Sequence, residues 1–366
     1  MKVLFITNIP SPYRMKFFNE LSRYVDLTVL FEGKRMDGIQ FNWTDEISPG
    51  LHIIYLSDYM KERKLNYKIF QHIQPKYDFV FATNYGYVTE LAAIFYMHWK
   101  KIPYILEIDG AIAPKRESFF KYWIKKQVIS NANALFSPSE NTDKILCKYG
   151  ANRKKIVHYP FTSLTDDDIY PDISSVTEKY TLRKELGIDS QWMVLAVGQF
   201  IPRKGFDTLL SAACTLQKEI GFVFVGGEPP KEYIEIIKQN NLSNIYFRCY
   251  QTAENLKKYY RAADVFCLPT RKDIWGLVIN EAMACGLPII TTTQCEAGNE
   301  LLKQQGILIE PENISALSEA IQSCLYNETK RIEMAQNSLK IIRRFTIKKM
   351  VEVHCKFMGI SKVTCV

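Results

Sequence analysis

Short apolar runs that recur along the whole chain are the feature that most restricts its fold. Several of them are apolar at consecutive positions, without the alternation of a half-exposed strand, which is typical of strands buried on both faces of a parallel sheet. The stretches between them, such as 206–220 and 279–285, have the apolar spacing of helices. The alternation predicts an α/β chain with two successive doubly wound, Rossmann-like domains. The expected strands are 3–8, 27–31, 52–56, 79–83, 104–108, 134–138, 193–198, 222–226, 245–249, 265–269, 288–292 and 307–309.

The length of 366 residues also favours two domains, at about 150 residues per domain. Residues 159–190 are rich in Pro, Ser, Thr and Asp and form the expected boundary. We interpret Asp166–Asp168 as part of a solvated linker, because three adjacent acids do not converge on one metal ion without an unusual turn. We therefore expect domains at 1–165 and 166–345, followed by an amphipathic helix in 346–366 that packs back on the first domain.

Composition indicates an ordinary soluble protein, with 47% hydrophobic and 23% charged residues. The longest apolar run, 91–99, is interrupted by His98 and is shorter than the roughly 18 to 20 residues that span a bilayer. The N-terminus reads as a first strand rather than as a signal peptide. Nine cysteines without a CxxC pair or metal-ligand spacing favour reduced thiols in the cytoplasm and no metal site.

The net charge of +8 comes entirely from the first half, where residues 1–160 carry 23 Lys and Arg against 15 Asp and Glu. Such asymmetry predicts an anionic partner, either a membrane surface or a nucleic acid. Segment 113–129 suits an anionic membrane, and a core helix with a cationic outer face is an equal alternative. No recognisable nucleic-acid-binding module is present, so we expect no nucleic acid partner. The segment interleaves Lys115, Arg116, Lys121, Lys125 and Lys126 with Phe119, Phe120, Tyr122, Trp123 and Ile124.

Ligands of open parallel sheets bind outside the carboxyl ends of the strands, and polar residues follow several expected strands here. The loop Pro10–Arg14 precedes a helix expected from near Met15, whose free N–H groups suit an anion. Arg203 and Lys204 precede Gly205 and suit a diphosphate, although a solvated turn with two incidental cations explains them equally well. The usual glycine-rich dinucleotide fingerprint and the P-loop are both missing.

Two acids, Asp273 and Glu281, flank the Trp275-Gly276 turn that follows the strand expected at 265–269. A helix rises 1.5 Å per residue, so Glu281 is expected about one turn into the next helix, close to the same crevice as Asp273. Small apolar residues surround Glu281 in 282–285, which argues against an ordinary surface position.

The run WGLVINEAMACGLPII, with RKGFDTLL upstream, resembles glycosyltransferase family 4, a family of retaining enzymes with the GT-B fold. The resemblance extends over most of the chain and is strongest from about 193 to 290. PSPYR and YPFTSL resemble the members that build capsular and cell-surface polysaccharides. The resemblance implies two Rossmann-like domains facing a central cleft, the first on the acceptor side and the second binding the nucleotide sugar.

The resemblance also implies roles for individual residues. The family has two Glu residues separated by seven positions, and Asp273 stands in place of the first, which meets the donor sugar with the backbone of Ile274, Trp275, Gly276 and Leu277. Glu281 corresponds to the second, which binds the ribose.

A second family pattern pairs an Arg with a Lys. Lys204 matches the Lys, Gln199 occupies the Arg position, and Arg203 is the candidate for the missing cation. Pro12 and Tyr13 correspond to the loop that approaches the diphosphate.

Family members often have a His near the acceptor, after the fifth strand of the first domain. The stretch LEIDG occupies this place, so Asp109 is the candidate and Glu107 the second choice.

The expected function is therefore transfer of a sugar, with retention, from a UDP- or GDP-sugar to a glycan or lipid-linked acceptor at the cytoplasmic face of the membrane. Outside 166–168 no Asp-x-Asp motif is present, so we expect metal-independent chemistry without a cofactor, in which cations stabilise the diphosphate leaving group. Retention is expected to proceed by attack on the same face. A nucleotide-sugar epimerase of the same fold is one alternative. A non-catalytic sugar-nucleotide-binding partner is another, because Asp273 and Gln199 depart from the pattern.

Overall fold

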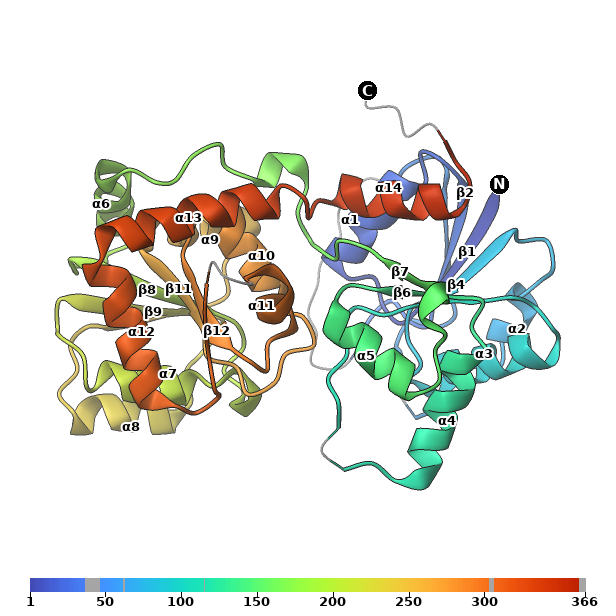
Figure 1. Cartoon of the computed structure of the whole chain (residues 1–366), viewed down its shortest axis with the longest axis horizontal. Helices are drawn as coiled ribbons and strands as arrows, with labels where there is room; N and C mark the ends of the chain where they lie inside the picture. Colours follow the sequence, from blue (N-terminus) through green and yellow to red (C-terminus); the bar gives the residue numbers. More distant parts are fainter. Residues whose placement is uncertain (37–46, 62, 115, 303–305, 362–366) are drawn as a thin grey trace. The chain divides into compact units, whose positions relative to one another are not determined.

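The computed structural model describes residues 1–36, 47–61, 63–114, 116–302 and 306–361, which form two compact units (Figure 1). The first unit comprises Met1–Ser163 together with Thr346–Val366, and the second comprises Leu164–Phe345. The chain therefore leaves the first unit once and returns to it at its C-terminus.

The first unit contains a seven-stranded parallel sheet in the order β3-β2-β1-β4-β5-β6-β7. The six strands predicted in this half correspond to β1 through β6, whereas β7 is half-exposed, follows a run of basic residues and was not predicted. The strands are β1 Lys2–Thr7, β2 Asp26–Phe31, β3 Leu51–Tyr55, β4 Phe79–Ala82, β5 Ile105–Glu107, β6 Ala134–Ser137 and β7 Ile156–His158. The helices are α1 Pro12–Leu21, α2 Ile69–His72, α3 Val88–Trp99, α4 Phe119–Ser130, α5 Glu140–Lys148 and the C-terminal α14 Ile347–Phe357.

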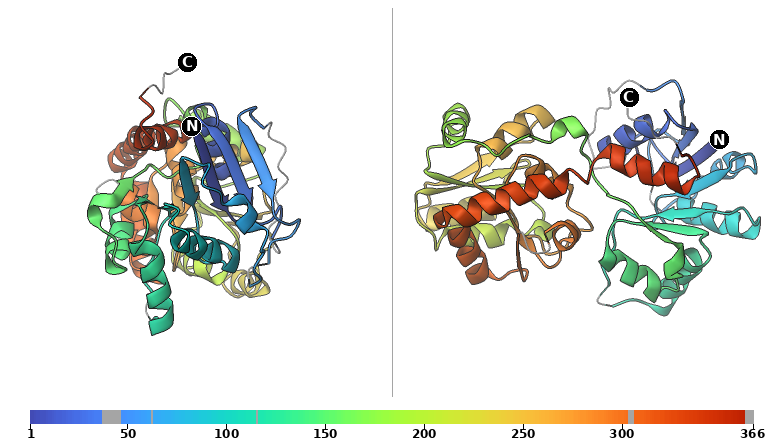
Figure 2. Two further views of the ribbon diagram at one scale, coloured as in Figure 1. Left: turned by 90° about the vertical axis from the view of Figure 1, so that its right-hand side faces the viewer. Right: turned by 45° about the horizontal axis from the view of Figure 1, so that its top comes forward.

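The C-terminal helix α14 belongs to the core of the first unit and lies beside α1 (Figures 1 and 2). Aromatic side chains form that core: the Phe5 and Phe81 rings stack with centroids 4.4 Å apart, and Phe357 meets Phe136 edge to face at 5.2 Å. The segment 346–357 thus buries its apolar face against strands that precede it by more than two hundred residues.

The second unit contains a six-stranded parallel sheet in the order β10-β9-β8-β11-β12-β13, and all six predicted strands of this half are confirmed. The strands are β8 Trp192–Val197, β9 Ile220–Val225, β10 Ile245–Arg248, β11 Val265–Leu268, β12 Ile289–Thr292 and β13 Ile307–Ile309. The helices are α6 Val176–Glu185, α7 Phe206–Ala213, α8 Lys231–Gln239, α9 Ala253–Ala262, α10 Leu277–Ala284, α11 Glu296–Leu301, α12 Ile314–Tyr326 and α13 Glu328–Ile342.

The helix predicted over 206–220 is wrong at its C-terminal end. Helix α7 ends at Ala213, and the Cys214 thiol and Thr215 hydroxyl hydrogen-bond back to carbonyls of the last helical turn. Ile220 already belongs to β9, where it is buried. Ile220 falls where the helical spacing of apolar residues in 206–213 would place another one, so the sequence pattern continues past the end of the helix.

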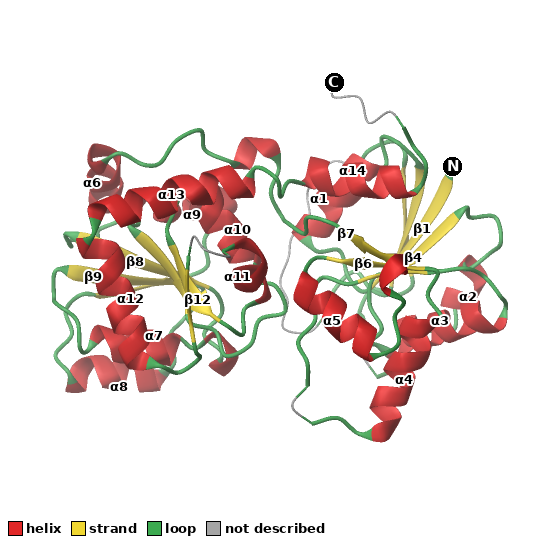
Figure 3. Cartoon of the chain, viewed as in Figure 1, coloured by secondary structure: helices red, strands yellow, loops and turns green. Residues whose placement is uncertain are grey.

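Both sheets have one topology, in which the first strand lies in the middle and the order reverses between it and the fourth strand. Helices pack on both faces of each sheet (Figure 3). The two units are thus doubly wound, Rossmann-like α/β domains, as predicted. In such folds ligands bind at the carboxyl end of the sheet where the strand order reverses, here between β1 and β4 and between β8 and β11. The predicted central cleft between the domains stays a prediction.

The segment between the domains is ordered by local contacts. Asp166–Asp168 form a short 3-10 turn, in which the Asp168 carboxylate accepts from the Thr165 backbone N–H at 2.8 Å and pairs with Lys257 at 2.8 Å. Asp166 and Asp167 are exposed. The eight cysteines among the described residues are free thiols, and none of the described helices has the length and apolar character needed to cross a membrane.

Candidate active site

The loop after β8 places Lys204 at the switch point of the second unit. The chain passes from Val197 through Gln199, whose side chain is exposed, into a 3-10 turn over Pro202–Lys204. Gly205 follows with a φ of +69°, and a Cβ atom there would lie 2.0 Å from the Pro269 carbonyl oxygen. Only glycine allows this close approach, so Lys204 is fixed against the end of β11.

Lys204 and Asp273 form the centre of the site. The Lys204 Nζ lies 2.5 Å from Asp273 Oδ2, and both side chains are buried. Arg203 approaches the other carboxylate oxygen at 3.5 Å, while its side chain remains 48% exposed. Two cations thus share one carboxylate, and the cluster keeps a net positive charge with the guanidinium facing solvent.

Backbone hydrogen bonds hold the loop that carries Asp273. Its N–H donates to the Gln294 carbonyl at 2.9 Å, and its carbonyl accepts from the Glu296 N–H at 3.2 Å. The Thr270 hydroxyl donates to the Arg203 carbonyl at 2.7 Å, which ties the two strand-end loops together. Asp273 therefore sits on a backbone fixed by β8, β11 and β12.

The residues after Asp273 form the turn into α10. Gly276 has a φ of +100°, which favours glycine, and the helix begins at Leu277. The Trp275 ring is buried and donates from Nε1 to Asn280 Oδ1 at 2.9 Å, whereas the Ile274 side chain is exposed. A ligand at this turn would meet backbone N–H groups and Ile274 rather than the indole.

Glu281 lies one turn into α10, as its spacing predicted, and is half-buried. Its carboxylate accepts a hydrogen bond at 2.9 Å from the Tyr260 hydroxyl of α9. Burial, together with the adjacent Glu281, raises the pKa of Tyr260 well above its usual value, so this phenol stays a donor. Asp273 thus pairs with Lys204 and Glu281 with Tyr260. Separate partners are compatible with two contact points for one extended ligand.

Arg271 is a further cation in this unit that the sequence did not single out. It forms a bidentate pair with Asp207 at the start of α7, at 2.5 and 2.9 Å, and pairs with Glu312 at 2.7 Å. Its backbone N–H donates to the Arg203 carbonyl at 2.8 Å. Arg271 thus positions the loop of Arg203 and Lys204.

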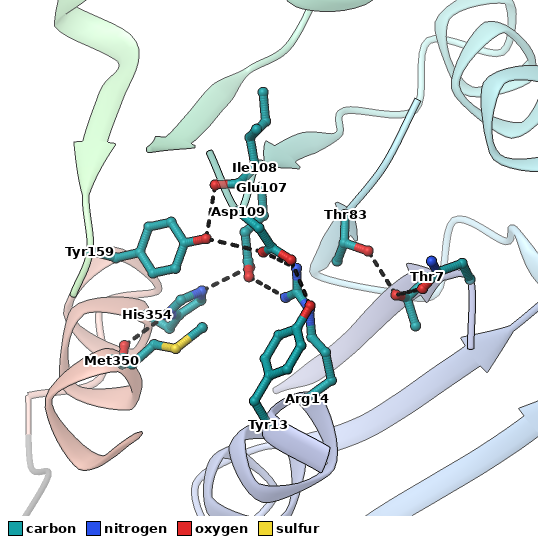
Figure 4. Close-up of polar contacts among 11 residues, drawn as sticks. Thr7, Tyr13, Arg14, Thr83, Glu107, Ile108, Asp109, Tyr159, Met350 and His354 are labelled. Carbon is teal, nitrogen blue, oxygen red and sulfur yellow. Dashed lines mark hydrogen bonds and ion pairs between the residues drawn. The ribbon is translucent and has the colours of Figure 1, made fainter. Parts of the chain in front are cut away.

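A second polar cluster lies at the carboxyl edge of the first unit (Figure 4). Tyr13, on α1 directly after Pro12, donates its hydroxyl to Asp109 Oδ2 at 2.7 Å, and the next residue, Arg14, pairs with the other Asp109 oxygen. Arg14 also lies 2.5 Å from Glu107 Oε1 at the end of β5. The Tyr159 hydroxyl donates to the Ile108 carbonyl at 2.9 Å.

The C-terminal helix closes this cluster from the far end of the chain. His354 Nε2 lies 3.0 Å from Glu107 Oε2, and Nδ1 lies 2.8 Å from the Met350 carbonyl oxygen. Burial opposes ionisation of Glu107, but Arg14 and His354 outweigh it and hold its pKa below the usual value.

Burial raises the pKa of Asp109, against the opposing effect of Arg14. Glu107 is thus fully enclosed by its partners, whereas the Asp109 side chain remains partly accessible. Of the two acids predicted here, Asp109 is the one that a ligand can reach.

Sequence reasoning missed three members of this cluster. Arg14 was visible as the last residue of PSPYR, but its two carboxylate partners lie 93 and 95 positions away. Tyr159 stood in the expected boundary region. His354 is 247 positions from Glu107, and no local signal connects them.

Comparison with known proteins finds a family that the second unit resembles. Residues 178–341 match the family described as "Glycosyl transferases group 1". The match covers less than half of the chain and lies wholly within the second unit, so this similarity is a property of the second unit.

The chain is also similar to curated glycosyltransferases. The chain is 31% identical over 173 residues to an uncharacterized glycosyltransferase of Methanocaldococcus jannaschii, covering 46% of each protein. It is 23% identical over 251 residues to an N,N'-diacetylbacillosaminyl-diphospho-undecaprenol alpha-1,3-N-acetylgalactosaminyltransferase of Campylobacter jejuni, covering 66% of each. The chain thus spans about half the length of the first of these relatives.

The fold resembles that of Anabaena Alr3699/HepE, solved in complex with UDP, with a TM-score of 0.78, 16% identity, and coverage of 98% of this chain and 100% of the other. The chain thus has the GT-B fold of glycosyltransferases.

Proposed function

We propose that this chain is a retaining glycosyltransferase of family 4 that moves a sugar from a nucleotide sugar to a glycan or lipid-linked oligosaccharide during surface polysaccharide biosynthesis. The observation that carries the proposal is the cluster of Arg203, Lys204 and Asp273 at the switch point of the unit that matches the glycosyl transferases group 1 family. Solved proteins of this fold have UDP or UDP-glucose bound, which favours a UDP-sugar as donor, with a GDP-sugar as the second choice.

In this proposal the donor lies along the edge of the second sheet. Arg203 and Lys204 bind the diphosphate, whose oxygens gain charge-assisted hydrogen bonds from both cations. Glu281 accepts hydrogen bonds from the ribose hydroxyls, held in place by Tyr260. The backbone N–H groups of 274–277 and the carboxylate of Asp273 position the sugar, and Gln199 lies at the end of β8 near the nucleotide.

The chemistry follows from charge that develops on the leaving group. As the bond between the anomeric carbon and the diphosphate breaks, negative charge grows on the diphosphate oxygens, and fixed cations stabilise it without reorganising. Asp273 holds Lys204 in a single position before the donor binds. The acceptor hydroxyl then attacks on the face from which the diphosphate departs, so the configuration at the anomeric carbon is retained. Its proton passes to a departing diphosphate oxygen.

A panel of UDP-, GDP- and CDP-sugars tests the proposal on the purified protein. We expect saturable binding of one nucleotide class, slow donor hydrolysis without an acceptor, and transfer with retention when a glycan acceptor is added. Conversion of the donor to its epimer without transfer would identify an epimerase instead. Binding without any turnover would identify a non-catalytic sugar-nucleotide-binding protein.

We further propose that α4 docks the first unit on an anionic membrane at its cytoplasmic face. Phe119 and Phe120 are 83% and 67% exposed, Trp123 is also exposed, and Lys121 and Lys126 lie among them. Val128 and Ile129, near the end of α4, are buried in the core, as the alternative of a core helix with a cationic outer face expects, whereas the exposed aromatic rings lie in its first turns. Exposed aromatic rings beside lysines suit the headgroup region of a bilayer. Lys115 lies outside the described residues.

Vesicle flotation tests this docking. We expect Phe119→Ser/Phe120→Ser to lose binding to vesicles that contain anionic lipid, while Val176→Ser, which removes an exposed apolar side chain of the second unit, retains it. Binding that is indifferent to lipid charge would contradict the proposal.

A further inference from the structure

A hollow of about 450 Å³ opens at the carboxyl ends of β2 and β3, within the first unit and apart from the donor-binding residues. Glu32 follows β2 and Ser57 follows β3, and both line the hollow. Its volume is in the range of small-molecule sites, which hold roughly 300 to 1,000 Å³. The other lining residues are Tyr59, Lys61, Lys64, Leu65, Asn66, Tyr67 and Lys68.

Glu32 supplies a buried polar group to this hollow. Its side chain is 3% exposed, and Oε1 lies 2.7 Å from the Thr89 hydroxyl on the first turn of α3. The other oxygen, Oε2, has no hydrogen-bond partner among the described residues. A buried carboxylate oxygen without a partner is costly unless a ligand or water completes it.

The wall of the hollow is built on the same threonine. Thr89 Oγ1 accepts from the Asn66 N–H at 3.1 Å and lies 3.2 Å from the Lys64 carbonyl oxygen. The Asn66 side chain donates to the Leu56 carbonyl at 3.2 Å. Lys64 and Asn66 are therefore held by the same threonine that binds the Glu32 carboxylate.

The rim of the hollow has the opposite character. Lys61, Lys64 and Lys68 are exposed, and none of them has a carboxylate partner among the described residues. Tyr59 and Tyr67 are exposed beside them. Three exposed ammonium groups attract an anion, and exposed aromatic faces suit the apolar face of a sugar ring.

We propose that this hollow binds an acidic sugar unit of the acceptor, a hexose ring that carries a carboxylate or a phosphate. Ring hydroxyls donate to the Glu32 carboxylate, a tyrosine covers the ring, and the acidic group lies among the three lysines. The inference rests on the proposed function, because it names the class of acceptor that the transferase uses.

Ligand titration of the purified full chain by calorimetry tests the inference without a donor. The probes are methyl glucuronide, glucose 6-phosphate, neutral methyl glucoside, and cyclohexanecarboxylate, which has a charge but no hydroxyl group. We expect at least one acidic sugar to bind about tenfold or more tightly than both the neutral sugar and the hydroxyl-free acid. The tighter of the two acidic sugars identifies the acidic group.

A matched pair of variants assigns the binding to the hollow. Lys64→Ala/Lys68→Ala should weaken the acidic sugar about fivefold or more, while Lys144→Ala/Lys154→Ala, which removes the same charge from exposed positions elsewhere in the unit, should not. Equal binding of acidic and neutral sugars, equal losses in the two variants, or no saturable binding below about 10 mM would overturn the inference.

Failure of the inference and failure of the proposed function are distinguishable. If nucleotide-sugar binding and transfer to a neutral glycan persist while the hollow binds no acidic sugar, only the inference falls. If the hollow binds the acidic sugar but no donor is bound or turned over, the proposed function falls.

Discussion

The two units place ion-paired clusters at the same edge of the same sheet topology, yet the clusters differ in accessibility. In the first unit, Arg14 and His354 enclose Glu107 completely, and all three side chains are buried. In the second unit, Lys204 and Asp273 are buried, but Arg203 extends into solvent. A closed cluster fixes elements of the fold to one another, whereas an open one keeps charge available for a ligand.

The largest expected effect breaks the closed cluster. Arg14→Ala leaves Glu107 and Asp109 without their shared guanidinium and should destabilise the first unit by about 3 to 5 kcal/mol, because a buried charge loses its partner. Urea denaturation measures the loss. The control is Arg23→Ala, which removes an exposed pair with Glu20 and should change stability by less than about 1 kcal/mol. Equal effects of the two substitutions would show that the enclosed cluster is not what holds α1 and β5 together.

The corresponding change in the open cluster should act on chemistry more than on stability. Lys204→Ala removes the inner cation and should slow transfer about 10²- to 10³-fold, because a fixed charge no longer stabilises the leaving diphosphate. Steady-state transfer measures the effect, and Lys218→Ala, an exposed lysine of the same unit, is the control. A variant that keeps full activity would place the diphosphate elsewhere.

The two acids of the second unit should separate binding from transfer. Glu281→Ala should weaken UDP binding about tenfold, since the ribose loses a charged acceptor, and should change the rate at saturation little. Asp273→Ala should slow transfer about tenfold or more while UDP affinity changes by less than about threefold, because Asp273 positions Lys204 and the sugar. Calorimetry with UDP and initial rates at saturating donor measure the two effects. The reverse pattern would exchange the two assignments.

The sequence predicted the sheets well because their signal is local. Short apolar runs, several of them uninterrupted, predicted twelve of the thirteen strands in the described residues, and the missed one, Ile156–His158, is half-exposed and follows a run of basic residues. The end of α7 was misplaced because the buried Ile220 of the next strand continues the helical period. Lys204 and Asp273 were likewise predicted as site residues because they closely follow predicted strands.

Pairings between distant residues could not be predicted. The Lys204–Asp273 contact joins residues 69 positions apart, and both were predicted as site residues without their mutual pairing. His354 and Glu107 meet only because α14 returns to the first unit. The Glu32 oxygen that lacks a partner among the described residues results from packing and has no pattern in the sequence.

Glu90, a buried acid of the first unit, should make the stability of the protein depend on pH. Glu90 is 1% exposed, and neither of its carboxylate oxygens has a hydrogen-bond partner in the part of the chain that the structure describes. Burial, and then the neighbouring Glu32, raise its pKa well above 4.5, with Arg14 opposing. Below about pH 4.5, Glu90 is protonated in both the folded and the unfolded state. As pH rises, the unfolded state loses the proton first, so the wild type loses stability until pH passes the folded pKa.

Glu90→Gln removes this titration. The free energy of unfolding of the variant minus that of the wild type should therefore rise with pH, by at most about 1.4 kcal/mol per pH unit. Thermal unfolding from pH 4 to pH 8 measures it, and any constant offset of the amide cancels in the slope. The same scan on Glu235→Gln, an exposed helix residue that faces water on α8, should be flat. If the stability difference between Glu90→Gln and the wild type does not change with pH, the Glu90 carboxyl is solvated in the folded protein.

The smallest expected effect concerns the exposed cation that makes the second cluster open. Arg203 stands beside Lys204, while Gln199 occupies the place of the arginine in the glycosyltransferase family 4 pattern that the sequence resembles. Arg203→Ala should therefore lower transfer about tenfold and Gln199→Ala about twofold or less. The loss should also shrink as salt rises, since an exposed charge is screened over about 8 to 10 Å at physiological ionic strength. Initial rates at low and high salt measure both. Equal small losses in the two variants would mean that the guanidinium does not replace the missing arginine, and that Lys204 alone carries the charge at this edge.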